Sequence, residues 1–314
     1  MDPEYTSYTM SWGTLGTVRP FTNFQPERDV MEVQAALEKK DTVTLVRILT
    51  NRNNAQRQVI SRTFEEKSGK NLSVALKKSM SGDLEDLLLL LLLPPDNAEA
   101  QRLQQAMAGL GTDEETLMEI LSTRSGKQLQ DISTAYRQLF KKDLEKELRG
   151  ETSGDFSKLL MALMKKHNVP AVVQSDVEAL AGSLSGKKVD AGQWINIFSS
   201  RHPDHLNKVL MGLELETGQM VSQIVEKRFS GDFRSALKVL VQCIQSPADY
   251  LAKRLSTMKT SMVHGIMVCH SEEDLLCVRV AYRKLTGTSL YSALQNHFKG
   301  EHLQALQAIC RSED

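Results

Sequence analysis

A unit of about 70 residues occurs four times in this chain, and this repetition limits the fold more than any other feature of the sequence. Each copy contains a basic marker residue, and successive markers are 72, 77 and 69 positions apart: Arg52, Arg124, Arg201 and His270. Thirty positions after each marker stands a glycine that is followed by an acid: Gly82, Gly154, Gly231 and Gly300. The segment from marker to glycine aligns in all four copies without a gap. Self-similarity at a fixed period is typical of repeat architectures.

Short helices are predicted in every copy. The six residues that end three positions before each marker have one apolar face at helical spacing: TLVRIL, TLMEIL, QWINIF and MVHGIM. Seventeen positions after the markers, three of the four residues are glycines, which suit the left-handed end of a helix: Gly69, Lys141, Gly218 and Gly287. No sustained alternation typical of strands appears. We therefore expect an all-α fold of four repeats, each with four to five short helices that pack on one another because such helices are marginal alone.

The spacings also divide the chain into segments. We expect an N-terminal tail at residues 1–25 and repeats at residues 26–95, 96–166, 176–246 and 247–314. Residues 167–175, which include Pro170, form the longest connection between repeats and are predicted to be a linker. Such a linker would divide the array into two halves.

Composition and charge exclude several classes of protein. Lysine plus arginine and aspartate plus glutamate are both 39, whereas a dedicated nucleic-acid binder needs a clustered positive field. The apolar run Leu87 to Leu93 is far shorter than the ~20 residues of a membrane-spanning helix. The chain opens without the apolar stretch of a secretory signal, and its four cysteines lack CxxC spacing, which fits a reducing compartment. We expect a cytoplasmic protein.

One loop has the residues of a calcium site. Gly109 and Gly111, two positions apart in the second copy, let the backbone turn sharply and aim its carbonyl groups inward. Glu151 stands 27 positions after the marker Arg124, just ahead of the next predicted helix. Calcium takes about six to eight oxygen ligands, and the carbonyls of Met107, Gly109 and Gly111 with a bidentate Glu151 would supply five of them. Water or a ligand oxygen would supply the rest.

The same loop has a purely structural interpretation. It could be the end of one helix followed by the start of the next, with Thr112 and Glu115 as a capping box. In the calcium interpretation, one carboxylate beside a divalent ion leaves a net positive charge, and this charge favours the binding of a lipid phosphate. The residues of this loop alone leave both interpretations open.

The chain resembles the annexin family. The segment from Met107 to Asp113, followed forty positions after Gly111 by Glu151, matches the family's calcium-loop pattern and its distant acidic ligand. The fourfold unit, the marker arginines and the segments LTNRNNAQRQVIS and RGETSGDF match as well, from about Phe24 to the end of the chain. The resemblance implies α-superhelical repeats in a curved disk with the calcium loops on its convex face. It also implies calcium-dependent binding to acidic, phosphatidylserine-like phospholipid, and a secondary ion at the Thr112 carbonyl and the Glu114 carboxylate.

The other three copies depart from the family's pattern. At the position of Glu151 they carry Ser79, Arg228 and His297, and a cation there would repel calcium. The first copy has no glycine in its loop, the third has Lys187 and Lys188 where the turn should finish, and the fourth is about five residues short. We therefore expect one calcium site and a weaker calcium response than that of an annexin with all its loops intact.

An enzyme and a calcium-independent scaffold are the two alternative classes of function. The sequence has no nucleophile elbow, P-loop, HExxH or dinucleotide fingerprint, so we expect no enzyme. A calcium-independent scaffold that binds membranes or proteins is the stronger alternative. In that case Lys187, Lys188 and Arg228 would meet at one edge and bind a phosphate directly, or they would form an ordinary solvated cluster.

The N-terminal tail is polar and contains Tyr5, Tyr8 and Trp12. By resemblance to annexins, a tail of this kind recruits a protein partner, in some relatives through an amphipathic helix. Gly13, Gly16 and Pro20 would interrupt such a helix here, which argues against that kind of partner.

Overall fold

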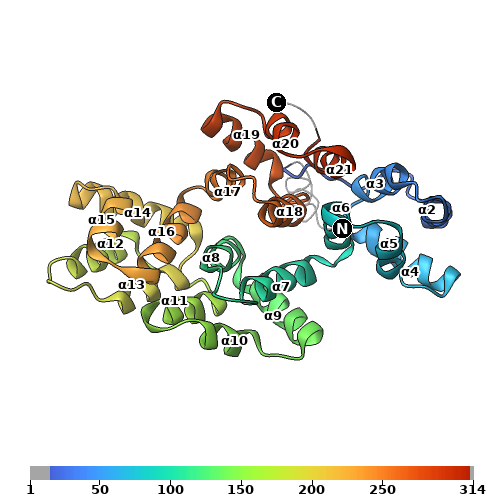
Figure 1. Cartoon of the computed structure of the whole chain (residues 1–314). Coiled ribbons are helices and arrows are strands. Elements are labelled where there is room, and N and C mark those ends of the chain that lie inside the picture. Colours follow the sequence, from blue (N-terminus) through green and yellow to red (C-terminus); the bar gives the residue numbers. More distant parts are fainter. Residues whose placement is uncertain (1–14, 312–314) are drawn as a thin grey trace. The chain divides into compact units, whose positions relative to one another are not determined.

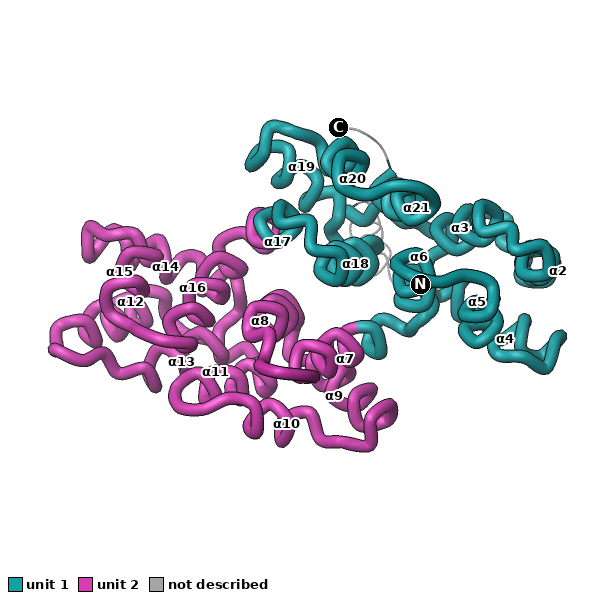
Figure 2. Tube along the Cα trace, viewed as in Figure 1, with its two compact units in different colours: residues 1–98, 251–314 teal, residues 99–250 magenta. Residues whose placement is uncertain are grey.

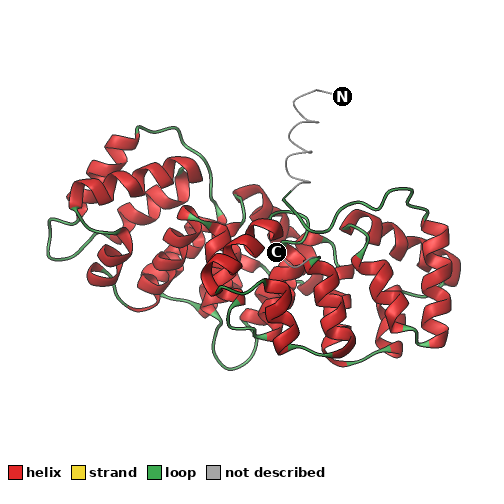
Figure 3. Ribbon diagram, turned by 90° about the horizontal axis from the view of Figure 1, so that it is seen from above, coloured by secondary structure: helices red, strands yellow, loops and turns green. Residues whose placement is uncertain are grey.

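A computed structural model describes residues 15–311, and within that range it contains helices and loops but no strand (Figures 1 and 3). The helices recur in four groups of five. The first two groups are α2 (Pro26–Lys39), α3 (Thr42–Thr50), α4 (Asn54–Ser68), α5 (Leu72–Ser79) and α6 (Gly82–Leu92), then α7 (Pro95–Ala106), α8 (Glu114–Thr123), α9 (Gly126–Phe140), α10 (Leu144–Glu151) and α11 (Gly154–Met164). The last two are α12 (Val173–Ser183), α13 (Ala191–Ser200), α14 (Pro203–Thr217), α15 (Val221–Arg228) and α16 (Gly231–Gln245), then α17 (Pro247–Leu255), α18 (Thr260–Cys269), α19 (Leu275–Thr286), α20 (Leu290–His297) and α21 (Gly300–Cys310). The all-α class with four helical repeats is confirmed.

The third helix of every repeat ends as the spacing predicted. The residue after it lies in the left-handed region, with φ of 67°, 57°, 66° and 76° in turn, at Gly69, Lys141, Gly218 and Gly287. Its N–H donates to the carbonyl four residues earlier, as in Gly69 to Glu65 at 2.8 Å. Glycine adopts this conformation without a steric cost, whereas Lys141 adopts it although it has a side chain.

The helices group into two compact units, and one of these units joins repeats that are not neighbours in the sequence (Figure 2). One unit contains the residues up to Ala98 and those from Leu251 on, which are the first and fourth repeats. The other spans Glu99–Tyr250, the second and third repeats. The expectation that residues 167–175 separate two halves is therefore wrong, because this segment lies inside one unit. His167 and Val169 there donate backbone hydrogen bonds to the end of α13, at 3.2 and 2.8 Å.

Both units use the same packing between their two repeats. The second helix of one repeat lies against the fifth helix of the other, in both directions. In the first unit the pairs are α3 with α21 and α18 with α6, and in the second they are α8 with α16 and α13 with α11. The apolar faces predicted before each marker are the buried faces of α3, α8, α13 and α18. Among the described residues, no helix has the length and apolar character that crossing a bilayer requires.

The marker arginines form buried ion pairs, which were not expected from the sequence. Arg52 donates two hydrogen bonds to the Asp29 carboxylate, at 2.7 and 2.8 Å, and both side chains are almost wholly buried. Arg124 pairs with Glu99 at 2.6 Å and Arg201 with Asp176 at 2.8 Å. Each acid lies in the first helix of its repeat and each arginine just after the second, so the pair holds the two helices together.

The fourth repeat uses a different contact at this position. His270 is buried, and its Nδ1 lies 2.8 Å from the Asp274 carboxylate, four residues further along the same chain segment. With Glu273, these residues bring one His and two carboxylate ligand atoms within 4.8 Å of one another. The contact is local and does not reach the first helix of the repeat as the arginines do.

We predict that Arg52→Met lowers the free energy of unfolding by about 3–5 kcal/mol, because it leaves the Asp29 carboxylate buried without its partner. Urea denaturation followed by circular dichroism measures the change. Arg47→Met is the matched control, since Arg47 forms an exposed pair with Glu32 at 2.7 Å that contributes ~1 kcal/mol or less. Equal losses in the two variants would contradict a special role for the buried pair.

A buried histidine pair predicts how stability depends on pH. His264 in α18 and His302 in α21 face each other with their Nε2 atoms 2.7 Å apart, and burial lowers the pKa of His264 to about 4. Its ordinary pKa is 6.5, so between pH 6.5 and 4 the unfolded chain binds more protons than the folded chain at this residue. Stability therefore falls as the pH falls through this window, by about 3 kcal/mol for His264.

Denaturation of the parent protein and of His264→Phe at pH 7, 5.5 and 4.5 tests this prediction. The parent should lose more stability than the variant between pH 7 and 4.5, because carboxylates elsewhere affect both proteins alike. Parallel losses in the two proteins would refute the assignment to His264.

Candidate calcium site in the second repeat

The predicted loop of the second repeat, residues 107–113, joins α7 to α8. Its base is closed by a hydrogen bond from the Asp113 N–H to the Ala106 carbonyl, at 2.8 Å. Gly109 and Gly111 have φ of 98° and 87°, a backbone region that other residues rarely adopt. The two glycines therefore allow the sharp turn that the sequence predicted.

Glu151 lies against this loop although it is 39 residues away from Thr112 in the chain. It is the last residue of α10, its side chain is exposed, and its Oε2 accepts a hydrogen bond of 2.9 Å from the Thr112 hydroxyl. The structure therefore brings together the loop and the distant carboxylate of the predicted site. Burial, together with the negative charges of Glu147 and Glu151, raises the pKa of the neighbouring Tyr136 to about 12.

The loop carbonyls have the chemistry that calcium requires. Within the described part of the chain, no hydrogen bond uses the carbonyl oxygens of Met107, Gly109 or Gly111. Gly109 and Gly111 are exposed, as is Glu114 in the first turn of α8, while Met107 is half-buried. Uncommitted carbonyls beside a carboxylate are a set of hard oxygen donors that fits calcium.

The residue that caps α8 is not the one that the sequence predicted. The residue that caps α8 is Asp113, whose carboxylate accepts hydrogen bonds from the Thr116 N–H and hydroxyl, at 3.0 and 2.8 Å. Thr112 is not the cap, because its hydroxyl donates to Glu151 instead. The helix start and the loop therefore use different side chains, and capping does not consume the groups of the predicted site.

The corresponding loops of the first and fourth repeats are shorter. Only Lys40 and Asp41 separate α2 from α3, and four residues, 256–259, separate α17 from α18. The residues at the position of Glu151 are Ser79 and His297, the last residues of α5 and α20. Ser79 is uncharged, and its hydroxyl lies 3.3 Å from the Ala75 carbonyl of its own helix and 3.5 Å from the Leu37 carbonyl.

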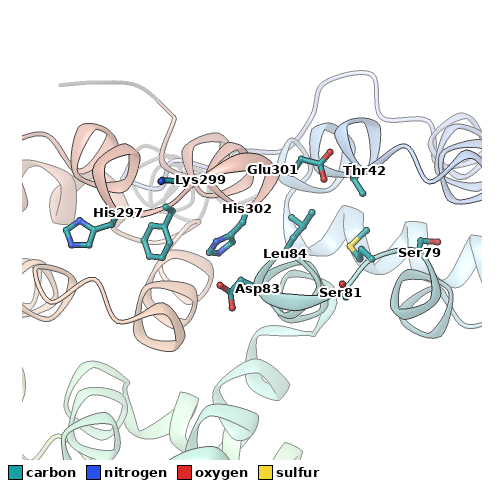
Figure 4. Close-up of a pocket in the computed structure, with 11 residues that line it drawn as sticks. Thr42, Ser79, Ser81, Asp83, Leu84, His297, Lys299, Glu301 and His302 are labelled. Atoms are coloured by element: carbon teal, nitrogen blue, oxygen red, sulfur yellow. The ribbon is translucent and has the colours of Figure 1, made fainter.

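Ser79 and His297 both line a polar hollow of about 670 Å³ in the unit formed by the first and fourth repeats. Figure 4 shows them at opposite ends of this hollow, with His302 and Asp83 between them. The hollow also contains Lys299 and Glu301, so its charges are mixed. The two positions therefore do not combine into one oxygen-lined cage.

The third repeat keeps the full length of the loop but fills it differently. Residues 184–190 join α12 to α13, seven residues as in the second repeat. Arg228, at the position of Glu151, donates from Nη1 to the Leu184 carbonyl at 2.7 Å and from Nη2 to the Gly186 carbonyl at 2.6 Å. The guanidinium therefore bonds inward to the loop, whereas the sequence suggested that it could bind a phosphate directly.

Comparisons with known proteins agree with this architecture. The Annexin family model matches residues 28–91 and 98–163. Annexin A9 of Mus musculus is 35% identical over 321 residues, which cover 98% of this chain and 92% of that protein. The solved structure of annexin III has a TM-score of 0.92 at 32% identity and covers 95% of this chain and 98% of its own. A structure of chicken annexin V in complex with Zn²⁺ has a TM-score of 0.86 at 32% identity, covering 95% and 99%.

The family's general properties follow from these matches. Annexins in general are calcium- and phospholipid-binding proteins rather than enzymes. Because the similarity to Annexin A9 extends over nearly the whole chain and the helices follow those of solved annexins, this chain belongs to the annexin family.

Proposed function

We propose that the loop of the second repeat and Glu151 bind one calcium ion, which connects the protein to the phosphate of an acidic, phosphatidylserine-like phospholipid. The hydrogen bond between Thr112 and Glu151, at 2.9 Å, is the observation that carries the proposal. It holds the one carboxylate that the site needs beside three uncommitted carbonyls. The cytosolic face of a membrane is the proposed location.

The ligand count and the charge both favour a phosphate as the further ligand. The carbonyls of Met107, Gly109 and Gly111 with both oxygens of Glu151 make five ligands, and calcium takes about six to eight. One carboxylate leaves the bound ion with a net positive charge, which attracts an anion. A second, weaker ion at the Thr112 carbonyl and the Glu114 carboxylate belongs to the same proposal.

Leu110 supports a membrane as the partner. It stands between the two glycines, and its side chain is fully exposed at the turn of the loop. A lipid surface that contacts the calcium ion would also cover this leucine, and full burial of a leucine side chain contributes about 1.5–3 kcal/mol. Free phosphate offers no such apolar contact.

A single site predicts a weak calcium response. Sites that share their coordination with water lie toward the weak end of calcium affinities, roughly 10⁻⁴–10⁻³ M. Several sites that engage one surface gain from effective concentration, and one site does not.

The alternative function, a calcium-independent scaffold, is favoured by one observation, the arginine that fills the loop of the third repeat.

A protein partner of the N-terminal tail also stays a proposal. Tyr5, Tyr8 and Trp12 lie outside the described residues. The described part of the tail packs on its own unit: Val18 donates to the Ser271 carbonyl at 2.9 Å, and Arg311 donates to the Thr17 carbonyl at 3.1 Å.

We predict that Glu151→Gln raises the calcium concentration for half-maximal binding to phosphatidylserine vesicles at least tenfold, because an amide keeps the shape of the side chain but removes its charge. Vesicle sedimentation across a calcium titration measures the shift. Glu147→Gln, on the same helix and paired with Lys142 at 3.2 Å, is the control and should leave the titration unchanged. If Glu151→Gln behaved like this control, the proposed site would be wrong.

We also predict that this protein needs more calcium than an annexin with three or four intact loops when both are sedimented with the same vesicles. The physical reason is the loss of multivalency described above. Equal calcium sensitivity of the two proteins would refute the single-site account.

A further inference from the structure

The loop of the third repeat is built like the proposed calcium loop but contains its own cation. Leu184 and Gly186 lie 17 and 15 residues before the marker Arg201, as Met107 and Gly109 lie before Arg124. These are the two carbonyls that the Arg228 guanidinium binds, at 2.7 and 2.6 Å. A positive charge is therefore already present where the second repeat would hold an ion.

This arrangement excludes calcium from the third loop. The carbonyls of Leu184 and Gly186 are committed to Arg228, and the fixed positive charge of the guanidinium repels a divalent cation. At the same time, a guanidinium that donates to two carbonyls holds the loop closed, because it fits them in a fixed geometry. The loop is thus organised without any added ion.

Hydrogen bonds hold the base of the loop. The buried Trp194 donates from its indole N–H to the Ser183 hydroxyl at 2.9 Å, and that hydroxyl donates to the Leu180 carbonyl at 2.6 Å. Asp190 at the other end accepts a hydrogen bond of 2.9 Å from the Gly192 N–H and so caps α13. The one acid of the loop is therefore committed to a helix start.

Beyond this base the loop presents positive charge. Lys187 and Lys188, which directly follow Gly186, are exposed, as is Lys227 beside Arg228. None of these three lysines forms an ion pair with any residue that the structure describes. The neighbouring Glu226 is paired with Lys238 at 2.8 Å and Arg234 at 3.5 Å, and these contacts lower its pKa.

We infer that this loop is a calcium-independent site for the phosphate groups of acidic phospholipid, in which Arg228 replaces the ion and Lys187 and Lys188 contact the headgroups. The inference shares its partner, an acidic phospholipid surface, with the proposed function, but it does not use calcium. Each basic residue near an acidic membrane raises the partition coefficient of the protein from water to the membrane roughly fivefold, and salt screens this contribution.

Vesicle sedimentation in a calcium chelator at low ionic strength tests the inference. The parent protein should bind phosphatidylserine vesicles and not phosphatidylcholine vesicles, and Lys187→Gln with Lys188→Gln should weaken this binding about 25-fold. Arg283→Gln with Lys284→Gln is the control, because it removes the same charge from an exposed basic pair at the end of α19. No binding by the parent, or equal losses in the two double variants, would overturn the inference.

Arg228 has a separate test as the positioning residue. Arg228→Met should speed amide hydrogen exchange in residues 184–188 and weaken calcium-free binding, while the circular dichroism of the folded protein stays unchanged. Faster exchange across the whole unit would show a general loss of stability and would overturn the local role. Unchanged exchange in the loop would overturn it as well.

Two further measurements distinguish free phosphate from lipid as the ligand and separate this inference from the proposed function. Inorganic phosphate at constant ionic strength should leave vesicle binding largely unchanged, and complete displacement would identify free phosphate rather than lipid as the ligand. Glu151→Gln should keep the calcium-free binding and lose only the increment that calcium adds. If the increment survives in Glu151→Gln, the proposed function fails; if calcium-free binding is absent, the present inference fails.

Discussion

The buried arginine–carboxylate pair is the interaction on which the rest of each of the first three repeats depends. In the second repeat, Glu99 lies near the start of α7 and Arg124 just after the end of α8, so their contact of 2.6 Å holds together the two helices that border the loop. Breaking a buried pair leaves an uncompensated charge in the interior, which makes this arrangement hard to loosen. The loop between the helices is therefore presented on a fixed frame, and its sequence can change without disturbing the fold.

The last residue of the fourth helix contacts this loop in the second and third repeats. Glu151 adds a carboxylate to uncommitted carbonyls and so favours an external divalent cation. Arg228, at the same place in the third repeat, brings a cation that belongs to the chain and uses the equivalent carbonyls itself. The two repeats thus differ at this position in the sign of the charge that the chain itself places beside the loop.

Much of the fold could be predicted from the sequence because the repeat carries local signals. Gly69, Gly218 and Gly287 predicted helix ends, since left-handed backbone is cheap for glycine, and the structure confirms all three. The partners of the markers were missed although a signal was present. An acid lies 23 residues before Arg52 and 25 before Arg124 and Arg201, at Asp29, Glu99 and Asp176, and the fourth repeat, with His270, departs from this pattern.

The sequence by itself determined the four helical repeats, the turn at Gly109 and Gly111, and the place of Glu151, because each depends on spacing within one repeat. Only the tertiary structure decided that the first repeat pairs with the fourth and the second with the third, since that choice depends on which apolar faces meet across long stretches of chain. The tertiary structure also decided the direction in which the Arg228 side chain points. Five donors on a flexible side chain are satisfied by whichever acceptors the fold places within reach, and here these are the carbonyls of Leu184 and Gly186.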